Sequence, residues 1–346
     1  MFGTELPIVL APMAGFGTVG LAVAVANAGG LGSLACASIS IDEAAAQIAA
    51  YRACGKPLNV NFFCHTTPTG DDESWRAKLA PYYAEFAITS ATPGTPRRPF
   101  DAAACALVER MKPEIVSFHF GLPPGELLAR IKATGARVIS SATTVREAVW
   151  LAERGCDAII AQGAEAGGHR GMFLTDDVAA QPGTFALVPQ VVDAVRVPVI
   201  AAGGIADARG IAAAFALGAS AVQLGTAYLA CPEANVTAIH RRALATATDD
   251  STAITNVFSG RPARGIINRA IRELGPMSAA APPFPLASAA LAPIRAKSEA
   301  AGSGDFTNLW AGQAAKLARA GEPAFELTRR LARETHELLR KLAVTA

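Results

Sequence analysis

The feature that most constrains the fold of this chain is a regular recurrence of short apolar runs, each bounded by turn residues. Most of the eight runs begin 21 to 27 residues after the preceding one. Uninterrupted runs of this length are typical of strands buried on both faces of a parallel sheet. The runs are Ile8–Met13, Leu31–Ala35, Leu58–Phe63, Glu114–Phe120, Arg137–Thr143, Ala158–Gly163, Pro198–Gly204 and Ala221–Thr226. An interval near 23 residues accommodates a strand, a loop and a crossover helix.

Helical patterns fill the intervals between these runs. In one of them, Ser40 precedes Asp42 and Glu43, an arrangement that favours a helix N-terminus. The predicted helices are Val19–Ala28, Ile41–Ala53, Pro124–Ala133, Thr143–Glu153, Thr184–Val195 and Asp207–Leu217. Eight strands alternating with helices predict an α/β fold of the (β/α)8 TIM-barrel type, with a doubly wound open sheet as the alternative.

The pattern changes after the eighth run. Residues 231–305 contain helical pieces such as Asn235–Ala247 and a Pro/Ala-rich stretch, Gly275–Pro293. The tail, Pro323–Ala346, has the leucine spacing of an amphipathic packing helix. We therefore expect a barrel over residues 1–230, a small helical subdomain over its mouth at 231–305, and a C-terminal segment and helix returning to the barrel at 306–346.

Two intervals of the barrel region are unusually long. Residues 64–113 include a Pro/Thr-rich stretch at 91–99, and residues 164–183 are rich in glycine. Long loops without structure of their own are often functional or mobile. Loops at the carboxyl ends of barrel strands build the active site, and the two intervals are expected to contribute there.

Composition excludes several classes of protein. Lys and Arg number 31 against 29 for Asp and Glu, so the chain has no basic field for nucleic acid and no polybasic membrane tail. The uncharged stretches 6–41 and 210–232 are broken by Gly, Pro or polar residues and predict buried helix-plus-strand pieces rather than membrane spans. The first basic residue is Arg52, so the charged start of a signal peptide is missing and a cytoplasmic location is expected.

The six cysteines show no metal-ligand spacing. They stand at positions 36, 54, 64, 105, 156 and 231, without CxxC or CxH patterns. We interpret them as small buried hydrophobic residues in a reducing compartment, and we predict no metal site.

Glycines end the seventh and eighth runs. Gly203 and Gly204 close one run, and Gln223-Leu224-Gly225-Thr226 closes the other. Glycine lets backbone N–H groups approach a phosphate, and barrels often bind phosphate between these two loops. Close helix–strand packing is the alternative explanation. The pattern favours a phosphate site.

The loop after the sixth run carries the candidate catalytic group. It reads Gln162-Gly163-Ala164-Glu165-Ala166-Gly167-Gly168-His169-Arg170-Gly171. Gln162 can offer its amide to a polar ring edge, and the paired glycines let the main chain press against a flat ligand. His169 is suited to moving a proton near neutral pH, although a histidine on a mobile surface loop is the alternative. Glu165 and Arg170 are interpreted as solvated loop charges.

Three further strand ends offer candidate site residues. Pro12 and Met13 can lay backbone and a thioether against a planar cofactor. Asn61 places an amide inside an apolar barrel, where a bound ligand would satisfy it, as would a protein partner. The His119 ring could likewise contact a bound ligand or could be a buried histidine bonded to the backbone. These strand ends are expected to meet at the barrel mouth.

Taken together, these motifs resemble the nitronate monooxygenase family. The resemblance rests on Ala11-Pro12-Met13, Asn59-Val60-Asn61, Ser117-Phe118-His119-Phe120-Gly121, the Glu165–Gly171 loop, both glycine loops and Asn308-Leu309-Trp310-Ala311-Gly312-Gln313. It covers nearly the whole chain. It implies an FMN-dependent (β/α)8 barrel with a helical second domain. It further implies an enzyme that uses O2, without a nicotinamide cofactor, to oxidise alkyl nitronates such as propionate 3-nitronate to carbonyl compounds and nitrite.

The same resemblance implies roles for individual residues. His169 would be the active-site histidine, acting either as the base for a neutral nitroalkane or as the holder of the anionic nitronate, and His119 would lie near the nitro group. The implied FMN contacts are Pro12, Met13, Asn61, Gln162, Gly167, Gly203, Gly204, Gln223, Leu224, Gly225, Thr226, Trp310 and Gln313.

Two other functions remain open at this point. An FMN-dependent NAD(P)H:quinone or enoyl-thioester reductase shares the glycine loops, and a non-catalytic flavin-binding barrel is a second alternative. An inosine-monophosphate dehydrogenase would need a cysteine in the loop at 164–183, which contains none. The sequence leaves the oligomeric state open, with a homodimer as one option.

Overall fold

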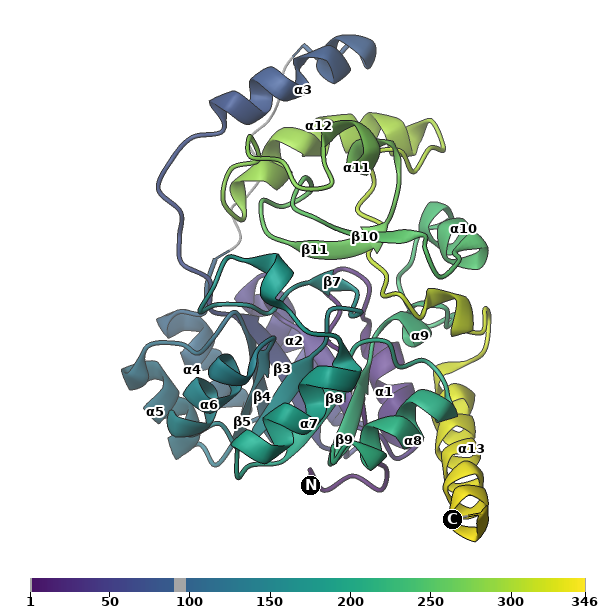
Figure 1. Cartoon of the computed structure of the whole chain (residues 1–346). Coiled ribbons are helices and arrows are strands. Elements are labelled where there is room, and N and C mark those ends of the chain that lie inside the picture. Colours follow the sequence, from purple (N-terminus) through teal and green to yellow (C-terminus); the bar gives the residue numbers. More distant parts are fainter. Residues whose placement is uncertain (1, 90–97, 346) are drawn as a thin grey trace.

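A closed parallel barrel forms the centre of the molecule (Figure 1). The structure is a computed structural model that describes residues 2–89 and 98–345. Eight parallel strands follow the order β1-β9-β8-β6-β5-β4-β3-β2, and a parallel bridge between Val9 and Leu31 joins the two ends of the sheet. The strands are β1 (Ile8–Leu10), β2 (Gly32–Ala35), β3 (Leu58–Phe63), β4 (Ile115–His119), β5 (Arg137–Ala142), β6 (Ala158–Gln162), β8 (Val199–Ala202) and β9 (Ala221–Leu224). All eight predicted strands are confirmed, and the open-sheet alternative is excluded.

The strands are buried on both faces, as their unbroken apolar sequences predict. Ile160 and Ile200 belong to a small cluster built mainly from strand residues, which fills the barrel interior. Their neighbours Ile159 and Val199 belong to the larger cluster that includes the surrounding helices. Successive side chains point to opposite faces of a strand, so most strand positions are apolar, with buried polar exceptions such as Asn59 and Asn61 of β3.

A ring of helices surrounds the sheet. These are α1 (Val19–Asn27), α2 (Ile41–Arg52), α4 (Ala102–Met111), α5 (Gly125–Ala133), α6 (Val145–Glu153), α7 (Thr184–Ala194) and α8 (Ala208–Ala216). The predicted helix starts are confirmed where a side chain caps them. The Ser40 hydroxyl accepts from the N–H of Glu43 at 3.1 Å, and the Asp207 carboxylate accepts from the N–H groups of Arg209 and Gly210.

The C-terminal helix α13 (Ala324–Thr345) takes the place of the eighth barrel helix. The element that directly follows β9 is the short α9 (Thr226–Leu229). Helix α13 instead contacts α1 and α8, which flank the last gap in the ring. Leu327 and Leu331 are buried in this contact, whereas Leu342, nearer the end of the helix, is exposed.

A second, smaller unit lies over the barrel mouth, and its composition corrects the expectation of a helical insert after the eighth strand. It contains an antiparallel sheet of order β10-β11-β7, formed by β10 (Thr252–Thr255), β11 (Ala263–Ile266) and β7 (Gly168–His169). Helices α11 (Arg269–Leu274) and α12 (Leu286–Ala300) lie above this sheet (Figure 1). The strands are too short and too polar to show a period in the sequence. Their pairing joins segments far apart in the chain.

The interval 64–113 also differs from the expected unstructured loop. It contains α3 (Glu73–Glu85), which packs on α12, and α4 of the helical ring. Trp75 of α3 is fully buried and donates its indole N–H to the carbonyl O of Ala287 at 3.3 Å. Residues 90–97, most of the Pro/Thr-rich stretch, lie outside the described residues. The remaining elements are α10 (Ala238–Thr246) and the 3-10 helices η1 (Val178–Ala180) and η2 (Ala315–Leu317).

Two expectations from composition can be compared with the structure. No helix within residues 2–89 and 98–345 is long and apolar enough to span a membrane. All six cysteines are free thiols. Cys36, Cys105, Cys156 and Cys231 are buried, and Cys54 and Cys64 are partly buried. Their interpretation as small interior residues is confirmed for four of the six.

Candidate active site

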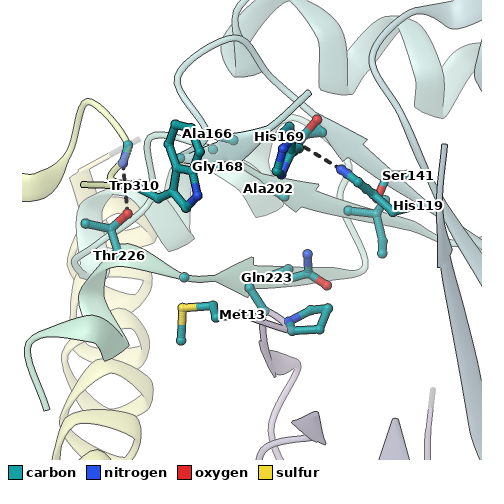
Figure 2. A pocket seen from close by; sticks show the side chains of 18 of the residues that line it. Met13, His119, Ser141, Ala166, Gly168, His169, Ala202, Gln223, Thr226 and Trp310 are labelled. Carbon is teal, nitrogen blue, oxygen red and sulfur yellow. Dashed lines mark hydrogen bonds between the residues drawn. The ribbon is translucent and has the colours of Figure 1, made fainter. Parts of the chain in front are cut away.

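A cavity of about 190 Å³ opens at the carboxyl ends of the barrel strands. Figure 2 shows Trp310 and His169 on one side of it, with Met13 and Gln223 on the other. Thirteen of the residues predicted for the site line it: Pro12, Met13, Asn61, His119, Gln162, Gly167, His169, Gly203, Gly204, Gln223, Gly225, Thr226 and Trp310. Two others do not. Leu224 is fully buried in the core between the strands and the helices, and Gln313 is exposed.

His119, at the end of β4, is a neutral imidazole with both nitrogens engaged. Its Nε2 lies 3.1 Å from the carbonyl O of His169, and its Nδ1 lies 3.0 Å from the Ser141 hydroxyl (Figure 2). A carbonyl only accepts, so the proton must be on Nε2, and Nδ1 accepts from Ser141. Burial lowers the pKa of His119 to about 3. The ring therefore stays neutral at physiological pH.

His169 is fixed at the cavity wall by backbone contacts as well as side-chain contacts. It belongs to β7, where it pairs with Ala263 of β11. Its carbonyl accepts from His119 and also from the Gln162 amide at 3.0 Å. Its Nε2 lies 2.9 Å from the Ser259 hydroxyl. These contacts place the imidazole in an ordered strand rather than on a mobile surface loop.

The Ser259 hydroxyl lies between two hydrogen-bond partners, Nε2 of His169 at 2.9 Å and the carbonyl O of Arg261 at 3.3 Å. A hydroxyl both donates and accepts, so Ser259 holds the His169 ring in place in either neutral tautomer.

The Gln162 amide makes two hydrogen bonds within its own loop. Its nitrogen donates to the His169 carbonyl, and its oxygen accepts from the N–H of Gly171 at 2.7 Å. The Asn61 amide likewise donates to the backbone and hydroxyl oxygens of Ser117. Both side chains still line the cavity, and their protein partners set their orientation there.

The interpretation of Arg170 as a solvated charge was wrong. Its side chain is fully buried and donates to the carbonyl oxygens of Gln162, Gly163 and Ala166. Its Nε donates to the Gln181 amide oxygen at 2.8 Å. Burial, reinforced by the positive charge of Arg264, lowers its pKa to about 9. The carbonyl groups that accept these hydrogen bonds belong to a glycine-rich turn. The sequence of this turn does not indicate that its carbonyl groups converge on a cation.

Glu165 was also misinterpreted as a solvated loop charge. Its carboxylate is half-buried and accepts from the backbone N–H and the hydroxyl of Thr184, at 2.8 to 2.9 Å. The contact places a negative charge at the start of α7, where it is favourable. Glu165 and Arg170 together shape the turn that carries Gly167 and His169.

The two glycine loops present unpaired backbone N–H groups. Gly203 and Gly204 have φ angles of 110° and 70°, which favour glycine. Among the described residues, none accepts a hydrogen bond from the N–H of Gly204 or Gly225. No side chain in the described part of the chain caps α9, which begins at Thr226. Such an arrangement suits an anion.

A strap at residues 308–313 closes the cavity on one side. The N–H of Gly312 donates to the Thr226 hydroxyl at 2.9 Å, and the N–H of Gln313 donates to the carbonyl O of Glu165 at 3.0 Å. His240, on α10, lies 3.1 Å from the carbonyl O of Trp310, so its Nε2 is the donor. Burial lowers the pKa of His240 to about 4. The strap thus joins the barrel to the smaller unit through Trp310.

Comparisons with known proteins identify the family of this chain. The model of a family described as nitronate monooxygenase matches residues 1–334. The chain belongs to the nitronate monooxygenase family. A nitronate monooxygenase from Paraburkholderia phytofirmans is 43% identical, covering 99% of this chain and 95% of its own length. One from Pseudomonas aeruginosa is 41% identical, covering 96% and 97%. The solved structure of a nitroalkane oxidase from Streptomyces ansochromogenes has a TM-score of 0.91 and 39% identity, covering 98% of both chains.

Several residues of this family site were not predicted from the sequence. Ser141 and Ser259 each bond a histidine that lines the cavity, and His240 bonds the strap. Phe63, Phe120 and Phe284 form a buried aromatic cluster against the His119 and His169 rings. Apart from the contact between the neighbours His119 and Phe120, these contacts join separate segments of the chain. No local motif could have indicated those.

Proposed function

We propose that the protein binds FMN at the barrel mouth and oxidises alkyl nitronates, such as propionate 3-nitronate, with O2 to carbonyl compounds and nitrite. The observation that carries this proposal is the cavity in which an ordered His169 faces two glycine loops with unpaired N–H groups. Membership of the nitronate monooxygenase family supports the substrate class.

The residues present fit the proposed cofactor. Gly204, Gly225 and Thr226 would hold its phosphate through backbone N–H groups. The Gln223 amide oxygen is buried without a hydrogen-bond partner in the described residues, and a donor on the flavin ring edge would satisfy it. Met13 and Trp310 offer apolar surfaces to a flat ring. Bound FMN supplies the electron-transfer chemistry, and the protein supplies binding, orientation and proton handling.

His169 is the group that we propose to meet the substrate. In either neutral tautomer the ring has one nitrogen without a proton, which suits it to remove the α-proton of a neutral nitroalkane. Once protonated, the same ring attracts an anionic nitronate. The Ser259 hydroxyl and the strand pairing of β7 keep the ring in one orientation during either task.

His119 has a positioning role in this proposal. Both of its nitrogens are engaged within the protein, and its low pKa keeps it from supplying a proton at neutral pH. It fixes the carbonyl of His169 and therefore the direction in which that residue points. The strap and the aromatic cluster limit the access of water to the same space.

The decisive experiment compares the wild-type enzyme with a His169→Asn variant. The absorbance spectrum of oxidised flavin in both proteins would establish bound FMN. Release of the flavin by acid would show that it is noncovalently bound. We expect the variant to retain FMN and to lose roughly 10²- to 10⁴-fold of its O2 consumption with a neutral nitroalkane, the usual range for a lost base.

Three results would contradict the proposal. Full nitroalkane activity in the His169→Asn variant would remove the base role. Rapid anaerobic bleaching of the wild-type flavin by NADH or NADPH would favour a reductase. Bound flavin without turnover of any nitronate or pyridine nucleotide would indicate a non-catalytic barrel.

A further inference from the structure

A second cavity adjoins the first beneath α12. It has a volume of about 40 Å³ and is here called the side chamber. His169, Trp310 and Asn308 line both cavities. The side chamber is completed by Phe258, Ser259, Ser288, Leu291, Ala292 and Arg295. A small molecule held at His169 therefore has the side chamber next to it.

Arg295 is the ionic group of the side chamber. No other Lys, Arg, Asp or Glu is among the described residues that line it. Its side chain is 44% exposed, so the guanidinium lies where the chamber meets solvent. The nearest carboxylate oxygen among the described residues is Oε1 of Glu299, which forms a long ion pair with Nε at 4.0 Å but no hydrogen bond. The same oxygen accepts from the Thr307 hydroxyl at 3.0 Å.

Most of the hydrogen-bonding capacity of Arg295 is unused by the protein. A guanidinium has five N–H donors. Within the described residues, Arg295 donates one hydrogen bond, from Nη1 to the Asn308 side-chain oxygen at 3.2 Å. That bond turns the Asn308 amide so that its nitrogen remains a donor. Ser288 donates its own proton to the carbonyl O of Pro285 and so offers the chamber no donor. The chamber offers the donors of the Arg295 guanidinium and of the Asn308 amide nitrogen, and the guanidinium also carries a positive charge.

We propose that the side chamber binds a carboxylate at the far end of the substrate, so that Arg295 selects nitronates that bear a second negative charge. This inference rests on the proposed nitronate substrate. A guanidinium matches a carboxylate with two parallel hydrogen bonds. The small volume fits a planar three-atom group and excludes a larger anion. His169 then meets the nitronate end, and Arg295 meets the carboxylate end.

Two substrates of equal carbon count test the pairing. Propionate 3-nitronate carries a carboxylate where propyl-1-nitronate carries a methyl group. We expect Arg295→Met to raise the KM for propionate 3-nitronate about fivefold, with kcat unchanged, the size of effect usual for a half-exposed charged contact. The kinetics with propyl-1-nitronate should not change. Arg295→Lys should keep part of the preference.

Lys297→Met is the matched control. Lys297 is exposed on the same helix and lies outside both cavities, and its loss removes the same charge. The Lys297→Met variant should have the kinetic parameters of the wild type with both substrates. Two results would show general steering by the helix charge and would overturn the assigned subsite. One is an equal rise in KM for both substrates in Arg295→Met. The other is a rise in KM for propionate 3-nitronate in Lys297→Met as large as that in Arg295→Met.

A binding measurement separates this inference from the proposed function. Succinate is a non-reacting isostere of propionate 3-nitronate, and butyrate is one of propyl-1-nitronate, because a carboxylate and a nitronate have the same shape and charge. Calorimetric titration of the flavin-loaded enzyme should show tighter binding of succinate than of butyrate, with the difference lost in Arg295→Met. Equal binding of the two acids by wild-type enzyme would overturn the inference. An Arg295-dependent preference without nitronate turnover would instead support the chamber and contradict the proposed function.

Discussion

At the scale of single residues, the turn that carries His169 depends on one buried cation. Arg170 satisfies the carbonyls of Gln162, Gly163 and Ala166, which all lie in the same turn. When the guanidinium is removed, the Gly163 carbonyl keeps the N–H of Ala166 as a donor, whereas the carbonyls of Gln162 and Ala166 lose the donor that Arg170 supplies. The residue beside the candidate base thus stabilises the loop without contacting the cavity.

Arg170→Met should therefore destabilise the protein by about 3 kcal/mol or more, the cost of leaving several buried acceptors without donors. Urea unfolding followed by circular dichroism measures this loss. Arg209→Met is the control, because Arg209 is 73% exposed and pairs with Asp207 at the surface. Its unfolding curve should superimpose on that of the wild type. Equal curves for the two variants would show that Arg170 is not a structural cation.

The sequence indicated His169, His119 and Gln162, but it did not indicate that the last two bond the carbonyl of His169. A histidine in a glycine-rich loop after a barrel strand is a local pattern, and so are the glycines after the last two strands. The hydrogen bonds of His169 with Ser259 and His119 depend on contacts between distant segments, whereas Gln162 lies in the same loop. Arg170 and Glu165 were misinterpreted because charged residues in a loop are usually solvated.

At the scale of elements, the barrel was predictable and the smaller sheet was not. A barrel strand needs apolar residues on both faces, which leaves a continuous run in the sequence. Strands β10 and β11 have one face toward helices and contain Thr and Arg, so their four-residue segments resemble loops. Strand β7 has two residues and exists only through its pairing with β11.

The strap provides a prediction for an element rather than for a side chain. A Cβ on Gly312 would lie 2.8 Å from the carbonyl O of Glu165 and 3.1 Å from the N–H nitrogen of Gly167. Gly312→Ala should push the strap away from this turn and weaken FMN binding about tenfold, as expected for an overpacked contact. Fluorescence titration of the apoprotein with FMN measures the Kd.

Gly125→Ala is the control for the strap. A Cβ there meets no atom of the described residues within 4 Å, and Gly125, the first residue of α5, lines neither cavity. Its FMN affinity should equal that of the wild type. Unchanged FMN affinity in Gly312→Ala would show that the strap does not shape the flavin site.

At the scale of the whole molecule, two buried histidines link the barrel to its covering unit and make stability depend on pH. His119 joins β4 to β7, and His240 joins α10 to the strap. Burial lowers their pKa values from 6.5 to about 3 and about 4. The unfolded chain therefore binds protons below pH 6.5 that the folded protein does not.

The free energy of unfolding should accordingly be greatest above pH 6.5 and should fall as the pH decreases toward 4. Each histidine contributes a slope of at most about 1.4 kcal/mol per pH unit, because the folded state excludes the proton that the unfolded state accepts.

His240→Gln keeps an N–H donor for the Trp310 carbonyl but cannot titrate. The gap in stability between wild type and this variant should therefore shift in favour of the variant as the pH falls from about 7 to about 4.5, a window set by the two pKa values of His240. Urea unfolding at several pH values within that range measures the gap, and the acidic residues common to both proteins cancel from the comparison. A gap that stays constant over the range would mean that His240 titrates alike in the folded and unfolded states, and that the contact between α10 and the strap does not depend on a neutral ring.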